Sequence, residues 1–373
     1  MKFKSNISEL KVALTKAKTT ISSKDNQPVL RNFCLKLVGN SLTILATDLD
    51  LSTVCHLSVE GLEDGLITIP GEKLFNIVNN SNSDVIEFDI LDKKATIKAG
   101  KYQATIQCLE ADDFPTIAEF TSSNPLKADR AVFLENLNRI SFSISDNEAR
   151  KNLLAVFINA GFIQASDGHV SSVCKFSSSI ENTLIPSLAV PDLVRVLRTS
   201  SAEFIEIATT DSFLLFRLDK DLFITRLSQA NFPDIPKKVL KPTEKNPIIA
   251  SVDKKAFIGV LNRVSITSNA NSLAVNFKIS NNKLELSAAD LEGNLSVEQI
   301  DCEHNQEAEF NLNYEYVLDI CKSVSSDTIS MKIHPNLRIP IRIDDGDFTA
   351  LLMRLAPSAL KQDNDEQKQT SED

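Results

Sequence analysis

Apolar residues recur along this chain with two different periods, and the order of the two periods repeats three times. Spacing of three and four residues, typical of an amphipathic helix, opens each repeat at 8–19, 131–143 and 255–267. Period-two alternation follows and predicts paired strands at 32–47, 155–166 and 274–288. A second helical segment comes next, at 70–80, 191–200 and 313–324. Further strands close each copy, so the pattern predicts an α+β fold of three tandem repeats, each with two helices on an antiparallel sheet.

Short sequence echoes mark the same three copies. Asp48, Asp167 and Asp290 each follow a predicted strand, and they lie 119 and 123 residues apart. That period is the length of a whole domain and is too long for a solenoid unit. Gly39-Asn40 and Asn281-Asn282 separate paired strands and are typical of hairpin turns.

Polar joins divide the chain into domains. We expect a first domain at 1–122, a second at 127–243 and a third at 248–355. Residues 356–373 have no apolar periodicity and end in acidic residues, so we expect a disordered acidic tail there.

Composition limits the class of protein. With 42% apolar residues, each domain can bury a core. The first residues contain no apolar segment of a cleaved signal, and no stretch approaches roughly 18 apolar residues, so we expect a soluble, cytoplasmic protein. The cysteines show no CxxC spacing, which favours buried reduced thiols over disulfides or metal ligands at Cys34, Cys55, Cys108, Cys174, Cys302 and Cys321.

The net charge of −10 argues against a surface that binds nucleic acid throughout, so the positions of the basic residues matter more. Lys16, Arg139 and Arg263 occupy one equivalent position near the end of each first helix. This recurrence favours a shared basic surface that neutralises phosphates, with a solvated helix face as the alternative for each residue. The candidate DNA-facing residues are Lys11, Lys16, Lys24, Arg139, Arg150, Arg195, Arg198, Lys254, Arg263 and Lys322.

No enzymatic motif is present in the sequence. Phosphate-binding, dinucleotide-binding and nucleophile-elbow motifs are absent, and the four histidines have no metal-ligand spacing. Asp167-Gly168-His169 has two interpretations, acid–base chemistry or a turn, and the turn is favoured because Asp48 and Asp290 lack the histidine. We therefore expect no catalytic residue, no metal and no cofactor.

Simple geometry connects such domains to a ring. A compact domain of about 120 residues behaves like a sphere of roughly 18 Å radius, so three in a ring leave a hole of only about 3 Å radius. Six leave a hole about 35 Å across by the same estimate. Duplex DNA is roughly 20 Å wide, so two chains closed head to tail would encircle it.

Five segments in order resemble the bacterial sliding clamps, the beta subunits of DNA polymerase III: the start MKF, LATDLDL at 45–51, ASDGH at 165–169, FPDI at 232–235 and MRL at 353–355. The resemblance covers residues 1–355. It implies a DNA clamp fold and a homodimeric ring that encircles double-stranded DNA, tethers the replicative polymerase for processive synthesis and performs no chemistry. It also implies a nucleoid-associated protein whose partners are the polymerase III alpha subunit, the clamp loader and other proteins with a clamp-binding motif, without membrane contact.

The resemblance further implies a partner-peptide pocket between the second and third domains. Its apolar side chains would hold the anchors of a short linear motif, and Arg354 or backbone groups would orient that motif. Core packing remains the alternative for the leucines. Carried over by position, the pocket residues are Leu153, Ser166, Gly168, His169, Pro233, Lys238, Val239, Leu351, Leu352, Met353, Arg354 and Leu355. The dimer interface is expected near Ala104, Ile106 and Ile266.

Several residues depart from the family pattern. Val170-Ser171 replaces the usual Arg-Leu after ASDGH, Ala155 replaces a glycine, and Leu352 replaces a proline. The chain also continues for 18 residues past the usual end. These departures leave a second function open, a divergent clamp-like scaffold of phage or mobile-element type with altered partner specificity.

Overall fold

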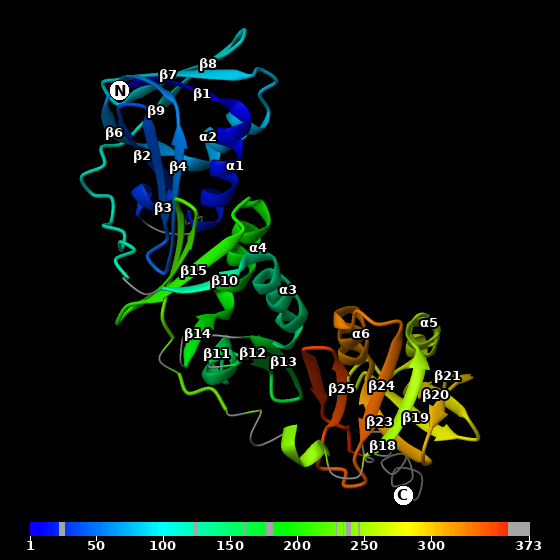
Figure 1. Ribbon diagram of the computed structural model, residues 1–373. Coiled ribbons are helices and arrows are strands. Elements are labelled where there is room, and N and C mark those ends of the chain that lie inside the picture. The colour runs from blue at the N-terminus through cyan, green and yellow to red at the C-terminus, as the bar shows by residue number, and fades with distance from the viewer. Residues whose placement is uncertain are drawn as a thin grey trace, which may run out of the picture. The chain divides into compact units, whose positions relative to one another are not determined.

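The computed structural model describes residues 1–21, 27–122, 125–159, 161–176, 182–228, 230–233, 235, 240–244 and 247–356. Lys24, Lys238, Val239 and the tail from residue 357 lie outside this set, and what the sequence predicts for them stays a prediction. Within the described part, no helix has both the length and the apolar character needed to cross a membrane. The chain forms two compact units, Met1–Glu135 with Ser178–Gln229 and Asn136–Ser177 with Ala230–Asp373, so the second repeat contributes to both (Figure 1).

The three repeats have a similar order of elements, although the described part of the second has one strand fewer than the other two. The first contains β1 (Lys2–Asn6), α1 (Ile7–Ala17), β2 (Asn32–Val38), β3 (Ser41–Thr47), β4 (Leu51–Ser58), β5 (Glu60–Glu63), β6 (Gly65–Pro70), α2 (Gly71–Asn79), β7 (Val85–Leu91), β8 (Lys94–Ala99) and β9 (Tyr102–Gln107). The second contains β10 (Leu126–Asp129), α3 (Arg130–Ile140), β11 (Ala155–Asn159), β12 (Gly161–Ser166), β13 (Val170–Phe176), β14 (Thr183–Pro186), α4 (Val190–Thr199), β15 (Phe204–Thr209), β16 (Phe213–Leu218) and β17 (Asp221–Arg226). The third contains β18 (Ile248–Asp253), α5 (Lys254–Val264), β19 (Ala274–Ser280), β20 (Lys283–Ala289), β21 (Leu295–Asp301), β22 (Glu303–His304), β23 (Ala308–Asn313), α6 (Tyr314–Ser323), β24 (Thr328–Ile333), β25 (Ile341–Asp345) and β26 (Phe348–Leu352).

The predicted helices and hairpins are present, but the prediction that each repeat opens with a helix is wrong. A strand of four to six residues comes first in every copy, as β1, β10 and β18. The two hairpin turns form as expected, because Gly39, Asn281 and Asn282 adopt positive φ angles of 55°, 51° and 58°. A short 3-10 turn, at Lys18–Thr20, Ser141–Ser143 or Ser265–Thr267, extends each first helix.

The first unit contains two antiparallel sheets, in the orders β5-β1-β7-β8-β9 and β10-β15-β16-β17-β4-β3-β2-β6. The second sheet crosses from one repeat to the next, because β17 pairs with β4 through partners such as Leu222 and Val54. Helix α1 packs on β3, β4 and α2. Its N-terminus is capped by the Asn6 side chain, which accepts the backbone N–H groups of Ser8 and Glu9.

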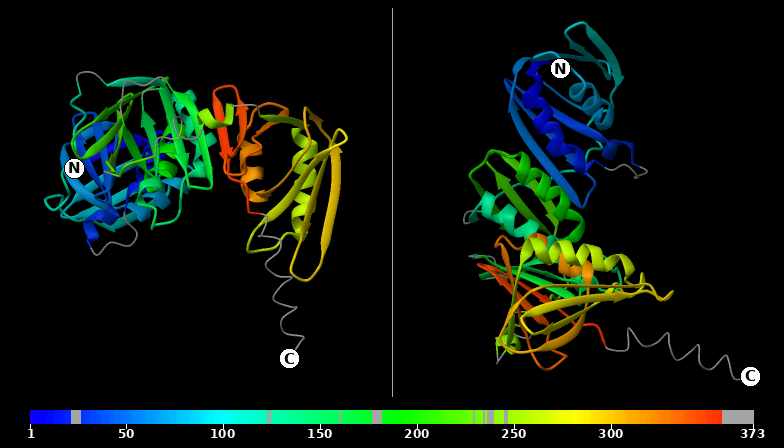
Figure 2. Two further views of the ribbon diagram at one scale, coloured as in Figure 1. Left: turned by 90° about the horizontal axis from the view of Figure 1, so that it is seen from below. Right: turned by 90° about the vertical axis from the view of Figure 1, so that its right-hand side faces the viewer.

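The second unit repeats this arrangement. Within this unit, one sheet contains the consecutive strands β11-β12-β13-β26-β25-β24-β18-β22 and crosses repeats where β13 pairs with β26, through Val170 and Leu352. The other runs β21-β20-β19-β23. Helices α5 and α6 lie side by side, α5 against β20 and β21 and α6 against β23 (Figure 2).

All six cysteines are buried, as the sequence predicts. Burial raises the pKa of the Cys34 thiol to about 11 and that of Cys321 to about 12. These thiols therefore stay protonated near neutral pH and serve as small core residues.

Candidate functional site

The three echoed aspartates hold turns. In each copy the Oδ1 atom of the aspartate (Asp48, Asp167 or Asp290) accepts two backbone N–H groups at 2.6–3.0 Å. The donors lie two to four positions further along the chain. An aspartate that bonds its own backbone in this way fixes a turn. This geometry favours the scaffold interpretation of the repeated motif.

The turn of the second repeat is reinforced from two sides. Arg150 Nη1 donates to the Asp167 carbonyl oxygen at 2.5 Å, and the Tyr316 hydroxyl donates to Asp167 Oδ2 at 2.5 Å. Gly168 has a φ of 93°, and a Cβ there would lie 2.4 Å from Arg150 Nη1. Burial and the neighbouring Asp167 raise the pKa of Tyr316, so its hydroxyl remains a donor. Arg150 therefore supports the turn from behind, although the sequence suggested a DNA-facing role.

The end of the described chain runs beside this turn. Met353 N donates to the His169 carbonyl oxygen at 2.9 Å, and Leu355 N donates to that of Asn311 at 2.9 Å. Gly168, His169 and Met353 are exposed, so they form an accessible rim. Residues Met353–Ala356 also line a cavity of about 600 Å³ together with Asn276, Glu309, Phe310, Asn311, Leu337 and Arg338.

Arg354 lines this cavity, but one end of its guanidinium bonds to the chain itself. Its Nη2 donates to the carbonyl oxygens of His334, at 2.9 Å, and Ile339, at 3.0 Å, and also to that of Asn336. Burial lowers the pKa of this guanidinium. Arg354 therefore fastens the last strand segment to a neighbouring loop.

Several predicted pocket residues are core residues. Leu153, Leu351 and Leu352 are 7%, 2% and 1% exposed. Leu351 packs with Val173 and Ile235, so the core alternative holds for these leucines. Ser166 is also buried, and its Oγ donates to the Val170 carbonyl oxygen at 2.9 Å. Pro233 is half-buried and Leu355 is half-exposed.

Lys16 and Arg139 do not lie on an open basic surface. Lys16 Nζ is 2.6 Å from Asp221 Oδ2, and the two side chains are 10% and 16% exposed. Asp221 Oδ1 also accepts the backbone N–H of His56 at 2.9 Å. This ion pair links α1 of the first repeat to β17 of the second, beside the β4–β17 sheet pairing, so the expectation that Lys16 faces DNA is not supported.

Arg139 occupies the corresponding place in the second unit. Its guanidinium forms an ion pair with Asp345, donates to the Ser323 carbonyl oxygen at 2.9 Å and lies 4.5 Å from the ring centre of Phe348. Burial raises the pKa of Asp345, but the Ser325 amide, the Ser326 hydroxyl and Arg139 outweigh it and leave that pKa lowered. The charge of Arg139 is therefore compensated inside the chain.

The remaining candidate cations differ in exposure. Lys254 Nζ donates to the Val324 carbonyl oxygen at 2.8 Å and is part-buried. Arg263 forms a two-pronged pair with Glu298, at 2.9 and 2.6 Å, but stays 60% exposed. Exposed positions on the helices are Lys11, Arg195, Arg198 and Lys322.

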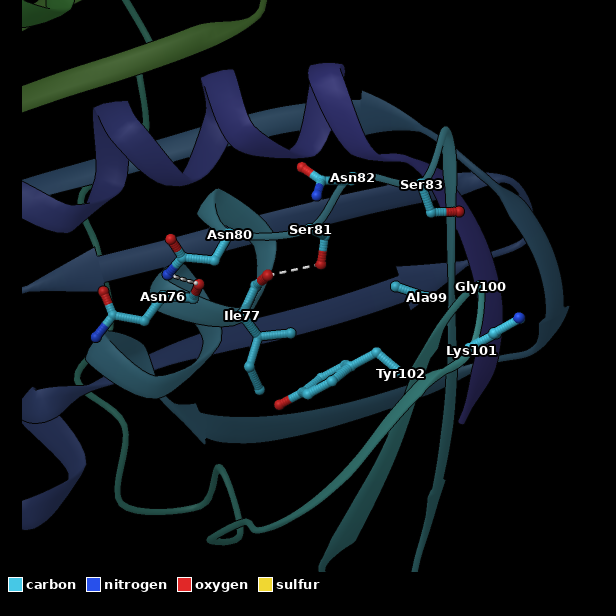
Figure 3. A pocket seen from close by; sticks show the side chains of 10 residues that line it. All are labelled: Asn76, Ile77, Asn80, Ser81, Asn82, Ser83, Ala99, Gly100, Lys101 and Tyr102. Carbon is cyan, nitrogen blue, oxygen red and sulfur yellow. Dashed lines mark hydrogen bonds between the residues drawn. The ribbon is translucent and has the colours of Figure 1, made fainter.

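A cavity of about 690 Å³ lies at the edge of the first repeat, between the end of α2 and the β8–β9 hairpin (Figure 3). Its walls come from Asn76–Ile77, Asn80–Ser83 and Ala99–Tyr102. Ile77 and Tyr102 point toward one another across it, whereas Lys101 points away. Of the expected dimer residues, Ile266 is 80% exposed, Ala104 is half-exposed and Ile106 is only 6% exposed. Ile106 therefore belongs to the core of its own repeat.

Sequence reasoning missed Tyr316, Tyr102 and the acceptors Asp221 and Asp345. No local motif surrounds them, and their partners lie in other repeats or at a surface. Among the described residues, no group of three His, Cys, Asp or Glu side chains is placed to hold a metal ion.

Comparison with known proteins decides the family. Models of three consecutive domains of the DNA polymerase III beta subunit match the chain, the N-terminal domain at residues 1–118, the central domain at 127–234 and the C-terminal domain at 238–353. The chain belongs to the DNA polymerase III beta subunit family. Members of this beta subunit family are sliding clamps, which are non-catalytic processivity factors. The predicted fold class, three clamp domains of α+β type, is confirmed.

Relatives of the beta subunit family resemble the chain along most of its length. The beta sliding clamp of Haemophilus influenzae is 27% identical over 328 residues, which cover 83% of this chain and 87% of that protein. That of Pseudomonas aeruginosa is 25% identical over 321 residues, covering 83% and 86%. The crystal structure of the Pseudomonas aeruginosa DNA polymerase III subunit beta superposes with a TM-score of 0.87 at 22% identity, covering 95% of this chain and all of that one. The Thermotoga maritima beta subunit has the same fold, with a TM-score of 0.86 at 19% identity and coverage of 95% and 99%.

Proposed function

We propose that this chain is a sliding clamp that encircles duplex DNA without sequence preference and tethers the replicative DNA polymerase for processive synthesis. Family membership supports the clamp function. The chain would act as a homodimer of six domains, in the cytoplasm and in association with the nucleoid. The domain limits 1–122, 127–243 and 248–355 belong to this proposal.

The main support for the proposal is that equivalent strands pair across two repeat junctions, whereas their counterparts at the two ends of the chain lie at sheet edges. β4 of the first repeat pairs with β17, the last strand of the second, and β13 of the second pairs with β26, the last strand of the third. Strand β21 of the third repeat is equivalent to β4 and β13, and β9 of the first repeat is equivalent to β17 and β26. In the described structure, β21 and β9 each lie at the edge of a sheet. Pairing β21 of one copy with β9 of another would join two chains head to tail and close a ring.

Charge and shape at these edges fit such a contact. Lys98 and Lys101 lie exposed at the β8–β9 hairpin, whereas Glu298 and Asp301 lie on β21. Each of these carboxylates pairs with a cation of its own chain, Arg263 or Lys283, but Asp301 stays 93% exposed and can still face the lysines of the other edge. The exposed Ile266 of one copy would pack near the half-exposed Ala104 of the other.

The helices would face the duplex. Lys11, Arg195, Arg198 and Lys322 are exposed, and their charges would neutralise DNA phosphates without reading the bases. Lys24 joins them as a prediction from the sequence alone. Lys16, Arg139, Arg150 and Lys254 are left out because they are buried or half-buried where they bond within the chain.

The rim of Gly168, His169 and Met353, with the adjoining cavity of about 600 Å³, would receive short motifs from partner proteins. Those partners are the polymerase III alpha subunit, the clamp loader and other proteins with a clamp-binding motif. Sliding clamps of this fold from Pseudomonas aeruginosa and Bartonella birtlesii have been crystallised with griselimycin. A small-molecule-accessible face is therefore compatible with the fold.

Retention on DNA tests the proposal. We expect a light-scattering mass of about twice the 41.2 kDa chain, retention on closed circular DNA after clamp loading, and loss when that DNA is linearised. Replacing Arg195 and Arg198 with alanine should lower the salt dependence of loading. Equal retention on circular and linear DNA would contradict the encircling ring.

The altered residues Val170, Ser171 and Leu352 support a second candidate, a divergent scaffold of phage or mobile-element type. Val170 and Leu352 are buried and face each other in the β13–β26 ladder. A chain that forms the ring but fails to stimulate the DNA polymerase of its own host would favour this scaffold. Stimulation of that polymerase would exclude it.

A further inference from the structure

Three basic residues occupy the equivalent position in the first helix of each repeat. Lys16, Arg139 and Arg263 are each the tenth residue of an eleven-residue first helix. Lys16 meets its acceptor 205 residues further along the chain, and Arg139 meets its acceptor 206 residues further along. The corresponding acceptor for Arg263 would lie beyond the end of this chain, in the first repeat of a second copy.

The acceptors belong to the closing pairs of equivalent hairpins, but they occupy opposite sides of those pairs. Asp221 begins β17 and pairs with Leu218 across a two-residue turn, while Asp345 ends β25 and pairs with Phe348 in the same way. The closing pair in the first repeat is Ala99 and Tyr102. Tyr102 therefore stands where Phe348 stands, and Ala99 stands where Asp345 stands.

The cavity of Figure 3 is the first-repeat version of the Arg139 site. Arg139 lies between the end of α6, where it bonds the Ser323 carbonyl oxygen, and the β25–β26 hairpin, where Phe348 lies under its guanidinium. The cavity lies between the end of α2 and the β8–β9 hairpin, and Tyr102 forms part of its wall. Tyr102 is 51% exposed, whereas Phe348 is fully buried, so the first-repeat site has an aromatic face available for a cation.

Arg263 differs from Lys16 and Arg139 because its acidic partner lies in its own repeat. Glu298 holds Arg263 with two hydrogen bonds, and this pairing lowers the pKa of Glu298. Glu298 lies opposite Leu286, whereas the residues opposite the equivalent Ile44 and Ile163 are the buried Cys55 and Cys174. A carboxylate on β21 of the same repeat thus replaces the carboxylate that the next repeat's hairpin supplies at the other two junctions.

We propose that Arg263 of one copy, still paired with Glu298, stacks on Tyr102 of a second copy inside the cavity of Figure 3. The proposal rests on the head-to-tail dimer proposed above. A guanidinium over an aromatic face is attractive and does not require a carboxylate from the partner. Because Glu298 stays with Arg263, this junction can separate without leaving an unpaired charge, whereas the Lys16 and Arg139 junctions cannot.

The dimer dissociation constant of the full-length chain, measured by sedimentation, tests the contact. Tyr102→Leu should raise the dissociation constant by about tenfold, while Tyr102→Phe, which keeps the aromatic face, should leave it within about twofold. Arg263→Gln should weaken the dimer similarly, and the double variant should be no weaker than the worse single variant. Phe213→Leu is the matched control, because it removes a ring beneath Arg226 elsewhere and should leave the constant unchanged.

Two outcomes would overturn this contact. A Tyr102→Leu chain with the wild-type dissociation constant would exclude the stacking, and so would additive effects of the two substitutions. Either result in a dimeric wild-type protein leaves the proposed ring intact. A wild-type chain that is monomeric at micromolar concentration would contradict the ring as well, so the two failures are distinguishable.

Discussion

The ion pair between Lys16 and Asp221 should hold the first two repeats together, and its removal should be expensive. The two side chains are 10% and 16% exposed, with Nζ 2.6 Å from Oδ2. Removing one partner of a buried pair costs about 3–5 kcal/mol because the other charge stays buried. The residual exposure of this pair favours the lower end, about 3 kcal/mol. Asp221→Asn is the sharpest change, since the amide oxygen can still accept the His56 N–H that is now 2.9 Å away.

The expected loss is measurable as a melting temperature. A unit of this size loses roughly 2–4 °C per kcal/mol, so Asp221→Asn should melt roughly 6–12 °C below the wild type. Lys16→Met should have a comparable effect, and the double variant should be less destabilised than the sum, with a coupling of about 2 kcal/mol. Hydrogen exchange at the β4 and β17 amides should rise in each single variant.

An exposed pair provides the control for this cycle. Lys93 and Glu110 are 56% and 61% exposed, so Lys93→Met should cost less than about 1 kcal/mol. A coupling between Lys16 and Asp221 below about 0.5 kcal/mol would refute the reasoning, because the pair would then contribute no more than a surface salt bridge.

Further predictions concern DNA, pH and the partner rim. Lys16→Met should leave the salt dependence of DNA retention unchanged, because its charge is already neutralised inside the chain. Because the pKa of Asp345 is lowered in the folded protein, its carboxylate stabilises the fold fully at pH values above the ordinary aspartate pKa of about 4. This contribution to the free energy of unfolding is lost as the pH falls toward the lowered pKa. The free energy of urea unfolding should therefore change less between pH 6 and pH 3.5 for Asp345→Asn than for the wild type. For the exposed Asp301→Asn, this change should match that of the wild type. Gly168→Ala should weaken binding of a fluorescent partner peptide more than tenfold, because a Cβ is strained at a φ of 93° and would displace the Arg150 guanidinium that supports the turn. Tyr316→Phe should weaken the same peptide only severalfold, and an unchanged affinity would mean that its hydrogen bond does not position the rim.

Local periodicity was enough to predict most helices and hairpins. The first helices bury residues at helical spacing, such as Leu10 and Leu14, and this signal is complete within one segment. The opening strands were missed because they are short and lie directly before a helix. β1 is five residues long, and its partners are in β7 and β5, so its identity depends on contacts that no local pattern contains.

The sequence predicted where the recurring basic residues of the candidate site lie, but it did not predict what they bind. The recurrence of Lys16, Arg139 and Arg263 located one equivalent surface, but a cation at the end of an amphipathic helix has the same sequence signature whether it faces phosphate or carboxylate. The acceptors lie 205 and 206 residues away, in hairpins whose acidic residues look like ordinary turn residues. Only the fold brings the two together.

Sheet pairings across the repeats have a consequence for dissecting this protein. A fragment that stops at residue 122 would keep both helices of the first repeat but would leave β4 without β17, its neighbour in the whole chain. A bare strand edge is a template for pairing with other molecules, so such a fragment should aggregate or swap strands. A fragment starting at residue 248 would expose the edge of β26 in the same way, because β13 would be gone. The repeats are copies in sequence, but they are not separable pieces for expression.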